Sequence, residues 1–373
     1  MNIPMLDLKG QYLKIKNEID TSIQEVVDSC SFINGPAVHS FEKSLAAYLD
    51  SRFVSGCANG TDALQIAMMA LELKPGDEVI VPAFTFAATA EVVGLLGLVP
   101  VLVDVDEQTF NISVQDIEKS ISPKTKAIVP VHLFGQAAPM EQIMKIAKAH
   151  SLYVVEDNAQ ALGAKYKFSD GTEKFLGTIG DIGCTSFFPT KNLGCYGDGG
   201  AIFTQNSKIA ARIKMVTDHG QKVKYHHDII GCNSRLDSIQ AAILDVKLKY
   251  LDSYSAARQK AAGVYRELLR DVKEVRLPQE SDYSNHVYHQ FTICVQKRDQ
   301  LREFLATKGI ASMTYYPLSL NKQKAFKEIS VTRVSLANSE KFANDVLSLP
   351  MHTELDLDIQ QVICNAIKEF YNN

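Results

Sequence analysis

Hydrophobic residues are spaced as in helices over the first part of the chain and then gather in short runs typical of strands. Apolar positions three and four residues apart predict helices over residues 13–29, 38–51 and 62–71. Runs rich in β-branched residues predict strands at residues 77–82, 99–105, 126–132 and 152–157, and helical stretches at 114–121 and 138–151 separate the later strands. Such alternation is typical of a mostly parallel sheet with helices on both faces. We therefore predict an α/β fold that binds ligands at the carboxyl ends of its strands.

The pattern changes towards the C-terminus. Short strands are predicted at residues 184–188 and 200–203, followed by a long helical stretch over residues 237–269. After Asn285 come a strand-like run at 289–295, a helix at 299–309 and a C-terminal helix. We predict a large α/β domain with an N-terminal helical segment over residues 1–250 and a smaller C-terminal α+β domain over residues 251–373. The boundary is expected between residues 245 and 260.

Composition narrows the choice of partners. The 373 residues carry 39 Lys+Arg and 43 Asp+Glu, a net charge of −4, which excludes a general attraction to nucleic acid or to anionic membranes. No apolar run approaches the roughly 20 residues of a membrane span, and the start of the chain has no signal-peptide pattern, so a cytoplasmic protein is expected. The seven cysteines are scattered without CxxC spacing, which predicts reduced thiols and no metal site.

Lys191 is the first candidate for chemistry. It lies in CTSFFPTKNLGCYGDGG, where a predicted strand runs into a glycine-rich turn. A desolvated lysine amine can form a Schiff base with an aldehyde cofactor and later move protons. The alternative is a solvated loop lysine, so the surroundings of Lys191 must decide.

Asp157 ends the apolar run LYVVED, and Gln160 follows it. A carboxylate at a buried strand end needs a cation or a hydrogen-bond donor, and a protonated pyridine nitrogen of pyridoxal phosphate would be such a partner. Capping of a following helix is the alternative role for Asp157. Glu156 points to the other face of the strand and is expected to be structural.

A phosphate seat is predicted at CANGTDAL. Gly60 and Thr61 stand at the start of a predicted helix, whose free N–H groups can bind an anion. Ser186, five residues before Lys191, could add its hydroxyl to the same phosphate. Many helices begin in this way without a ligand, so this motif indicates a phosphate site only in combination with the other candidate residues.

Taken together, these residues resemble the nucleotide-sugar aminotransferase family, the DegT/StrS-type branch of fold-type I pyridoxal-phosphate enzymes. The resemblance extends over nearly the whole chain, in the segments IPMLDL, FINGPAVHSFE, CANGTDAL, VPAFTFAATA, VVEDNAQA, SFFPTKNLG, GDGGAI, GCNSRLDSIQAAIL and YYPL. It implies pyridoxal 5'-phosphate as cofactor, cycling with pyridoxamine 5'-phosphate. It also implies a homodimer with shared active sites.

The resemblance assigns a role to each candidate residue. Lys191 would hold the cofactor as a Schiff base, Asp157 would meet its pyridine nitrogen, and Gln160 would contact the ring substituents. The phosphate would lie at Gly60, Thr61 and Ser186, the ring of Phe86 would stack on the cofactor, and Asn233 would reach the phosphate of the neighbouring subunit. Relatives with histidine at the position of Lys191 carry out dehydration, so Lys191 favours transamination.

The substrate is inferred from the same resemblance. L-glutamate would donate the amine, and a nucleotide-linked keto-sugar would accept it. The segments around Arg235 and Tyr316 look most like the subgroup acting on UDP-linked 3-keto sugars such as UDP-2-acetamido-3-keto-glucuronic acid, in amino-sugar synthesis for surface polysaccharide. Arg235 could bind a uronic-acid carboxylate, the glutamate donor or a structural acid such as Asp237. Ser319 departs from the family pattern, which commonly has histidine there.

Two alternatives remain open from the sequence. The enzyme could use the same cofactor with a different amino acceptor, a dTDP-linked 3- or 4-keto-6-deoxysugar. A non-catalytic regulatory protein could share the fold and bind pyridoxal phosphate without catalysing a reaction. The joint presence of Lys191, Asp157 and Gln160 argues against the second alternative.

Overall fold

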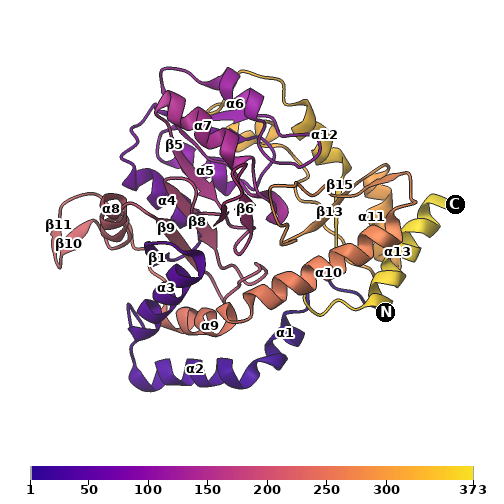
Figure 1. Ribbon diagram of the computed structural model, residues 1–373, viewed down its shortest axis with the longest axis horizontal. Helices are drawn as coiled ribbons and strands as arrows, with labels where there is room; N and C mark the ends of the chain where they lie inside the picture. Colours follow the sequence, from indigo (N-terminus) through magenta and orange to yellow (C-terminus); the bar gives the residue numbers. More distant parts are fainter. Residues whose placement is uncertain (1, 373) are drawn as a thin grey trace.

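A central sheet with helices on both faces forms the larger part of the molecule (Figure 1). The computed structural model describes residues 2–372. The strands of this sheet are β1 (Phe53–Cys57), β9 (Gly200–Thr204), β8 (Ile182–Ser186), β5 (Tyr153–Asp157), β4 (Thr125–Ile128), β2 (Glu78–Pro82), β3 (Val99–Val103) and β14 (Val331–Thr332), in that spatial order. Strand β9 runs antiparallel to both neighbours, whereas the other neighbours pair in parallel. The prediction of a mostly parallel α/β sheet is confirmed.

Alternating side chains of the strands face two separate hydrophobic cores. Val79 and Val81 of β2 pack in the core that holds residues of α4 and α5, whereas Ile80 packs in the core that holds residues of α6 and α7. This two-sided burial explains why β2 is apolar at every position after Glu78, as expected for a strand inside a parallel sheet. The helices around the sheet are α3 (Pro36–Leu49), α4 (Gly60–Ala70), α5 (Ala88–Leu95), α6 (Val114–Ser120), α7 (Met140–His150), α8 (Ser207–Thr217) and α9 (Ser238–Leu248).

Two predicted helices are each divided in the structure. The stretch predicted over residues 13–29 forms α1 (Leu8–Lys14) and α2 (Lys16–Ser29), because Ile15 between them has non-helical angles (φ −122°, ψ 18°). Its side chain is buried with Ile19 and with Ile243 of α9, so tertiary packing overrides the local helical pattern. The stretch over residues 237–269 likewise forms α9 and α10 (Leu251–Leu269).

The C-terminal part contains a second, antiparallel sheet of β12 (Val275–Arg276), β13 (Phe291–Val295) and β15 (Val346–Leu349). Helices α11 (Arg298–Thr307), α12 (Ala337–Asp345) and α13 (Leu357–Asn372) accompany it. Its hydrophobic core takes in residues of α10, α11 and α13, and also Ile3 from the start of the chain. Strand β14 instead extends the large sheet beside β3. The division at residue 250 remains a prediction.

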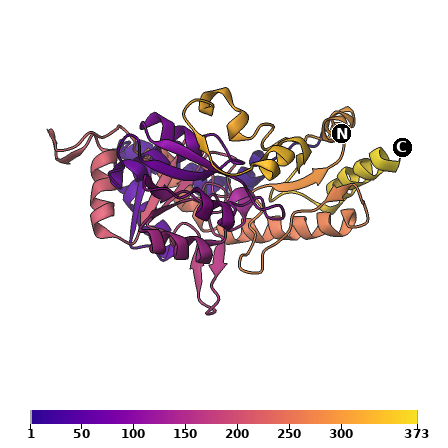
Figure 2. The same cartoon turned by 90° about the horizontal axis from the view of Figure 1, so that it is seen from above.

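Short hairpins and turns complete the fold. The hairpin β6 (Lys165–Lys167) and β7 (Glu173–Phe175) projects from the body in Figure 2, and the hairpin β10 (Gln221–Val223) and β11 (His226–His227) lies at one end of the molecule. Short 3₁₀ turns lie at Leu133–Gly135, Leu320–Lys322 and Lys324–Phe326. Over residues 2–372, no helix combines the length and the hydropathy that crossing a membrane requires.

Candidate active site

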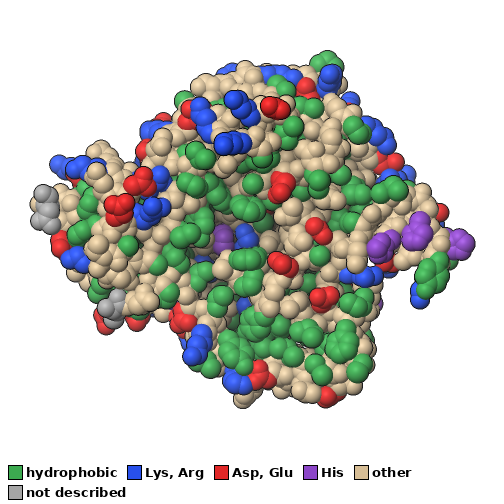
Figure 3. All heavy atoms as spheres, turned by 180° about the vertical axis from the view of Figure 1, so that it is seen from behind, with side chains coloured by type: hydrophobic (Ala, Val, Ile, Leu, Met, Phe, Trp, Pro, Cys, Tyr) green, Lys and Arg blue, Asp and Glu red, His purple; other side chains and the backbone are tan. Residues whose placement is uncertain are grey.

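The candidate residues meet where two neighbouring parallel strands end. Asp157 is the last residue of β5, and Ser186 is the last residue of β8. The two strands pair in parallel, with Asp157 opposite Cys184, so both carboxyl ends lie at the same edge of the sheet. The loop that follows β8 carries Lys191. On the face shown in Figure 3 the molecule is hollowed near its centre, and histidine and basic side chains are visible inside.

Asp157 is buried and well supplied with donors. Its Oδ2 accepts a hydrogen bond from Thr89 Oγ1 at 2.8 Å, and its Oδ1 accepts from the backbone N–H of Ala159 at 3.2 Å. Burial raises the pKa of Asp157, although Thr89, Ala159 and the charge of Lys191 oppose this shift. The alternative role of Asp157 as a helix cap is not observed, because a turn follows β5. A cation facing Asp157 would complete its neutralisation.

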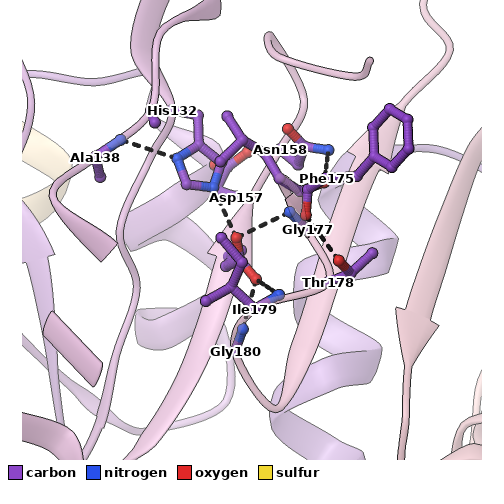
Figure 4. Close-up of polar contacts among 12 residues, drawn as sticks. His132, Ala138, Asp157, Asn158, Phe175, Gly177, Thr178, Ile179 and Gly180 are labelled. Carbon is purple, nitrogen blue, oxygen red and sulfur yellow. Dashed lines mark hydrogen bonds and ion pairs between the residues drawn. The ribbon is translucent and has the colours of Figure 1, made fainter. Parts of the chain in front are cut away.

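Glu156 faces away from Asp157 and has a structural environment. It is fully buried, and its Oε1 accepts from the N–H groups of Ile179 at 2.7 Å and Gly180 at 2.6 Å. Its Oε2 accepts from Gly177 N–H at 2.8 Å and from His132 Nε2 at 2.9 Å (Figure 4). Four donors thus meet one carboxylate, which fixes the turn before β8 to the end of β5.

His132 connects this carboxylate to the loop after β4. Its Nδ1 accepts from the N–H of Ala138 at 3.1 Å, so the ring proton is on Nε2 and points at Glu156. The backbone N–H of His132 donates to the carbonyl oxygen of Asp157 at 3.1 Å. The N–H of Asp157 in turn donates to the carbonyl oxygen of Pro130 at 2.9 Å, so both backbone groups of Asp157 are bonded to the segment that follows β4.

Lys191 stands in a tight loop beside Asp157. Its backbone N–H donates to the carbonyl oxygen of Phe188 at 2.8 Å. Burial lowers the pKa of its amine to about 8, and this effect outweighs the charge of Asp157, which raises it. An amine with this pKa is partly free of its proton near neutral pH, as a Schiff-base lysine requires.

The start of α4 forms a cradle against Ser186. Asn59 caps the helix, since its Oδ1 accepts from the N–H of Asp62 at 2.8 Å. Gly60 and Thr61 are the first residues of the helix. A Cβ atom on Gly60 would lie 2.6 Å from the Cβ of Ser186, so only glycine fits there. An anion at this place would meet the N–H groups of a helix start and a hydroxyl.

Gln160, Tyr316 and Phe86 form one wall of the site. The side chain of Gln160 accepts from Phe134 N–H at 2.7 Å and donates to the hydroxyl of Tyr316 at 3.0 Å. The rings of Phe86 and Tyr316 lie 6.0 Å apart. Phe86 is 56% exposed although its neighbour Tyr316 is only partly accessible to solvent, so its ring has a free face for stacking.

The residues proposed for substrate lie in different surroundings. Arg235 Nη1 is 3.4 Å from Oδ1 of Asp218, whereas Asp237 is the residue before α9. Asn233 is exposed, and Ser234 beside it accepts from the N–H of Ala58 at 3.1 Å, next to the cradle.

No hydrogen bond or ion pair within residues 2–372 joins Asn233 or Arg235 to Lys191 or Asp157. Ser319 is buried, and its hydroxyl donates to Asn321 at 2.6 Å, so it faces its own turn.

Some site residues escaped the sequence analysis. Thr89 is the second residue of α5 and lies three positions after Phe86, which stands just before the helix. This short spacing was the available signal. Phe134 contributes its backbone N–H from a left-handed conformation with φ 59°, for which the side-chain pattern holds no signal.

These features fit pyridoxal phosphate. The buried Asp157 suits its ring nitrogen, and the partly deprotonated Lys191 suits its aldehyde. The cradle at Gly60 suits its phosphate, and the open face of Phe86 suits its ring. The fold and the site together define a fold-type I, pyridoxal-phosphate-dependent aminotransferase. The model of the DegT/DnrJ/EryC1/StrS aminotransferase family matches residues 13–368, and the chain belongs to that family.

Curated relatives match over almost their whole length. A "Pleiotropic regulatory protein" of Geobacillus stearothermophilus is 47% identical, with 100% of each chain covered. The UDP-2-acetamido-2-deoxy-3-oxo-D-glucuronate aminotransferase of Pseudomonas aeruginosa is 44% identical, over 98% of this chain and 99% of the relative. A dTDP-3-amino-3,4,6-trideoxy-alpha-D-glucose transaminase of Streptomyces venezuelae is 38% identical, over 99% and 96%.

Solved structures agree with the fold and the cofactor. DesV of S. venezuelae, in complex with a ketimine intermediate, has a TM-score of 0.95 and 38% identity, over 100% of this chain and 99% of that chain. NtdA of Bacillus subtilis, with bound cofactor PMP, has a TM-score of 0.89 and 33% identity, over 100% and 86%. The chain is a sugar aminotransferase whose cofactor cycles between pyridoxal and pyridoxamine phosphate.

Proposed function

We propose that this enzyme transfers the amino group of L-glutamate to a UDP-linked 3-keto sugar, such as UDP-2-acetamido-3-keto-glucuronic acid, in the cytoplasm. The product would serve amino-sugar synthesis for surface polysaccharide. The observation that carries the proposal is the 44% identity, over nearly full length, to the P. aeruginosa aminotransferase for that substrate class.

The roles of the residues follow from their positions. When bound, pyridoxal phosphate supplies an aldehyde carbon that takes up an amino group and a ring that withdraws electrons. Asp157, held by Thr89 at 2.8 Å, would keep a proton on the ring nitrogen. The pKa of the Lys191 amine is lowered to about 8. This amine would accept the proton from the substrate carbon and would deliver it to the aldehyde carbon of the cofactor, C4′.

The remaining site residues would position the reactants. Gly60, Thr61 and Ser186 would bind the phosphate at the start of α4, and the exposed face of Phe86 would stack on the ring. Gln160, fixed by Phe134 and by Tyr316, would contact a ring substituent. Tyr316 and Arg235 would contact the substrates.

We further propose a homodimer in which Asn233 of the partner subunit reaches the phosphate. Three apolar side chains on and beside the β10–β11 hairpin support this, since Val223, Tyr225 and Ile230 are 62%, 79% and 86% exposed. Such exposure near Asn233 is typical of a protein interface.

Mixing two inactive variants tests the shared site. Lys191→Ala and Asn233→Ala subunits, unfolded and refolded together, would form heterodimers that have one site without either substitution. Activity would then return in the mixture. No recovery in refolded mixtures that contain heterodimers would contradict a shared site.

Turnover assays test the substrate. Purified enzyme with L-glutamate and each keto-sugar should release 2-oxoglutarate fastest with the UDP-linked 3-keto sugar, and Lys191→Ala should release none. A preference for a dTDP-linked keto-6-deoxysugar would instead favour the second candidate, which the 38% identity to the S. venezuelae transaminase supports. Failure with UDP-linked 3-keto sugars would overturn the first.

The name of the G. stearothermophilus relative concerns regulation. A non-catalytic role is disfavoured for this chain, since Lys191, Asp157 and Gln160 stand together in a site with a lowered lysine pKa. An amine donor that left the visible spectrum of the cofactor-loaded enzyme unchanged would reverse this judgement.

A further inference from the structure

Lys247, near the end of α9, carries an enclosed amine. The residue is 1% exposed, and its Nζ donates to the carbonyl oxygen of Gly194. The same amine lies 5.3 Å from the ring centre of Tyr196. Within residues 2–372 the titratable groups that act on it are Cys195 and Arg258, so no carboxylate neutralises its charge.

Gly194 belongs to the loop that carries Lys191. The loop is closed at its base, because Cys195 N–H donates to the carbonyl oxygen of Phe187 at 2.8 Å. A Cβ atom on Gly194 would lie 2.4 Å from the carbonyl oxygen of Pro189, so the two limbs of the loop touch. The contact from Lys247 therefore fixes the second limb only three residues after Lys191.

A second residue of the same helix holds this limb. Gln240 lies two turns before Lys247, and its Oε1 accepts from the N–H of Tyr196 at 2.8 Å. One face of α9 thus binds the limb at two backbone groups on either side of Cys195. The ring of Tyr196 also lies over the amine of Lys247.

The energetics indicate that Lys247 does more than fill space. Burying an ammonium group without an acid is costly, and burial lowers the pKa of Lys247 to about 8. Its place in the last turn of α9 and the carbonyl of Gly194 offset part of this cost. An apolar side chain of similar volume would avoid the cost. Methionine would also leave the Gly194 carbonyl without its donor, so the two effects oppose each other and stability of the fold alone gives little reason for a lysine here.

We propose that Lys247 is a positioning residue that fixes the Lys191 loop through the Gly194 carbonyl, so that the amine of Lys191 is held at the reacting atoms. This inference rests on the proposed role of Lys191. It assigns to α9 a function in catalysis without any contact with the substrate.

Hydrogen exchange in the cofactor-free protein tests the inference directly. In Lys247→Met, amides of residues 188–197 should exchange about tenfold faster or more, because the loop loses its anchor. The melting temperature should change little, because removal of the buried charge offsets the loss of the donor to the Gly194 carbonyl. Lys247→Arg should restore slow exchange, since guanidinium can also donate to the carbonyl. Lys247→Gln serves as a second variant if methionine impairs folding, and intermediate exchange is expected.

Ile243→Ala is the matched control. Ile243 is 1% exposed on the same helix, but it packs with Ile15 and Ile19 rather than against the loop. The control should lower the melting temperature and leave exchange of residues 188–197 within about twofold.

In the loaded enzyme, Lys247→Met should lower kcat for the glutamate half-reaction about tenfold with little change in KM. Unchanged exchange and kcat in the methionine and glutamine variants, or equal effects in Ile243→Ala, would overturn the proposal. Failure of Lys191→Ala to abolish the Schiff-base absorption band would instead refute the role of Lys191, while the exchange experiment would still report on the loop.

Discussion

Replacing Glu156 by glutamine should strongly destabilise the protein although the two side chains have the same shape. One oxygen of the amide can still accept from Ile179 and Gly180, as Oε1 does in the native protein. The NH₂ group would then stand where Oε2 accepts from Gly177 and His132. Two donors would face another donor.

A change of histidine tautomer cannot repair this. If the ring proton of His132 moved to Nδ1, then Nε2 could accept from the new amide. Nδ1 would then face the N–H of Ala138, from which it now accepts at 3.1 Å. Either tautomer leaves buried donors unpaired, and each lost bond to a charged acceptor costs about 1.5–3 kcal/mol, or about 3–6 kcal/mol for two.

Thermal unfolding of the cofactor-free protein, followed by circular dichroism, measures the effect. A loss of this size should lower the melting temperature of this 373-residue chain by about 4–8 °C. Asp181→Asn is the control, because Asp181 Oδ2 accepts from Val154 N–H at 2.8 Å and an asparagine oxygen can replace it. The control should lose less than about 3 °C. If Glu156→Gln were no less stable than Asp181→Asn, the account of four donors on one carboxylate would be wrong.

Further predictions concern the site itself. Thr89→Val removes the hydroxyl that donates to Asp157 at 2.8 Å, so kcat should fall about tenfold or more in steady-state assays, and an unchanged kcat would contradict a role for this bond. Gly60→Ala places a Cβ atom 2.6 Å from the facing serine of β8, so the Kd for pyridoxal phosphate in fluorescence titrations should rise about tenfold or more. Gly263→Ala, with nothing within 4 Å, should leave that Kd unchanged and raise stability by about 0.5–1 kcal/mol. Burial lowers the pKa of the Lys191 amine from 10.5 to about 8, and only the unprotonated amine reacts with a methylating reagent. The rate of reductive methylation of Lys191 in the cofactor-free protein, followed by mass spectrometry, should therefore rise with pH with a midpoint near pH 8. A midpoint near pH 10.5 would contradict this.

The sequence contained enough information for the fold and for the centre of the site. Asp157 and Ser186 end apolar runs, and parallel strands necessarily bring such ends to one edge, where Lys191 follows. The cradle at Gly60 has a local signature as well, because helix starts depend on nearby residues.

The remaining features depend on packing between distant segments. The break at Ile15 arises from its contact with α9, and the anchoring of the Lys191 loop by Lys247 joins residues 53 positions apart. Strand β14 is only two residues long and pairs with β3 far earlier in the chain, so no periodicity could reveal it. Such contacts are decided by the assembled fold rather than by local propensity.

The reversed direction of β9 has a consequence for how the catalytic loop can vary. A parallel successor to β8 would require a crossover that carries the chain to the opposite edge of the sheet. Here β9 begins at the edge where β8 ends, with Gly200 paired to Ser186 on one side and to Cys57 of β1 on the other. The segment 187–199 is thus a wide hairpin loop whose two ends are fixed by the strand register. The entropy cost of closing such a loop depends only weakly on its length. Insertions would be tolerated only at exposed positions such as Asp198, because Asn192, Leu193 and Cys195 in the middle of the loop are buried. A one-residue slip at either end would displace the lysine and the phosphate cradle together.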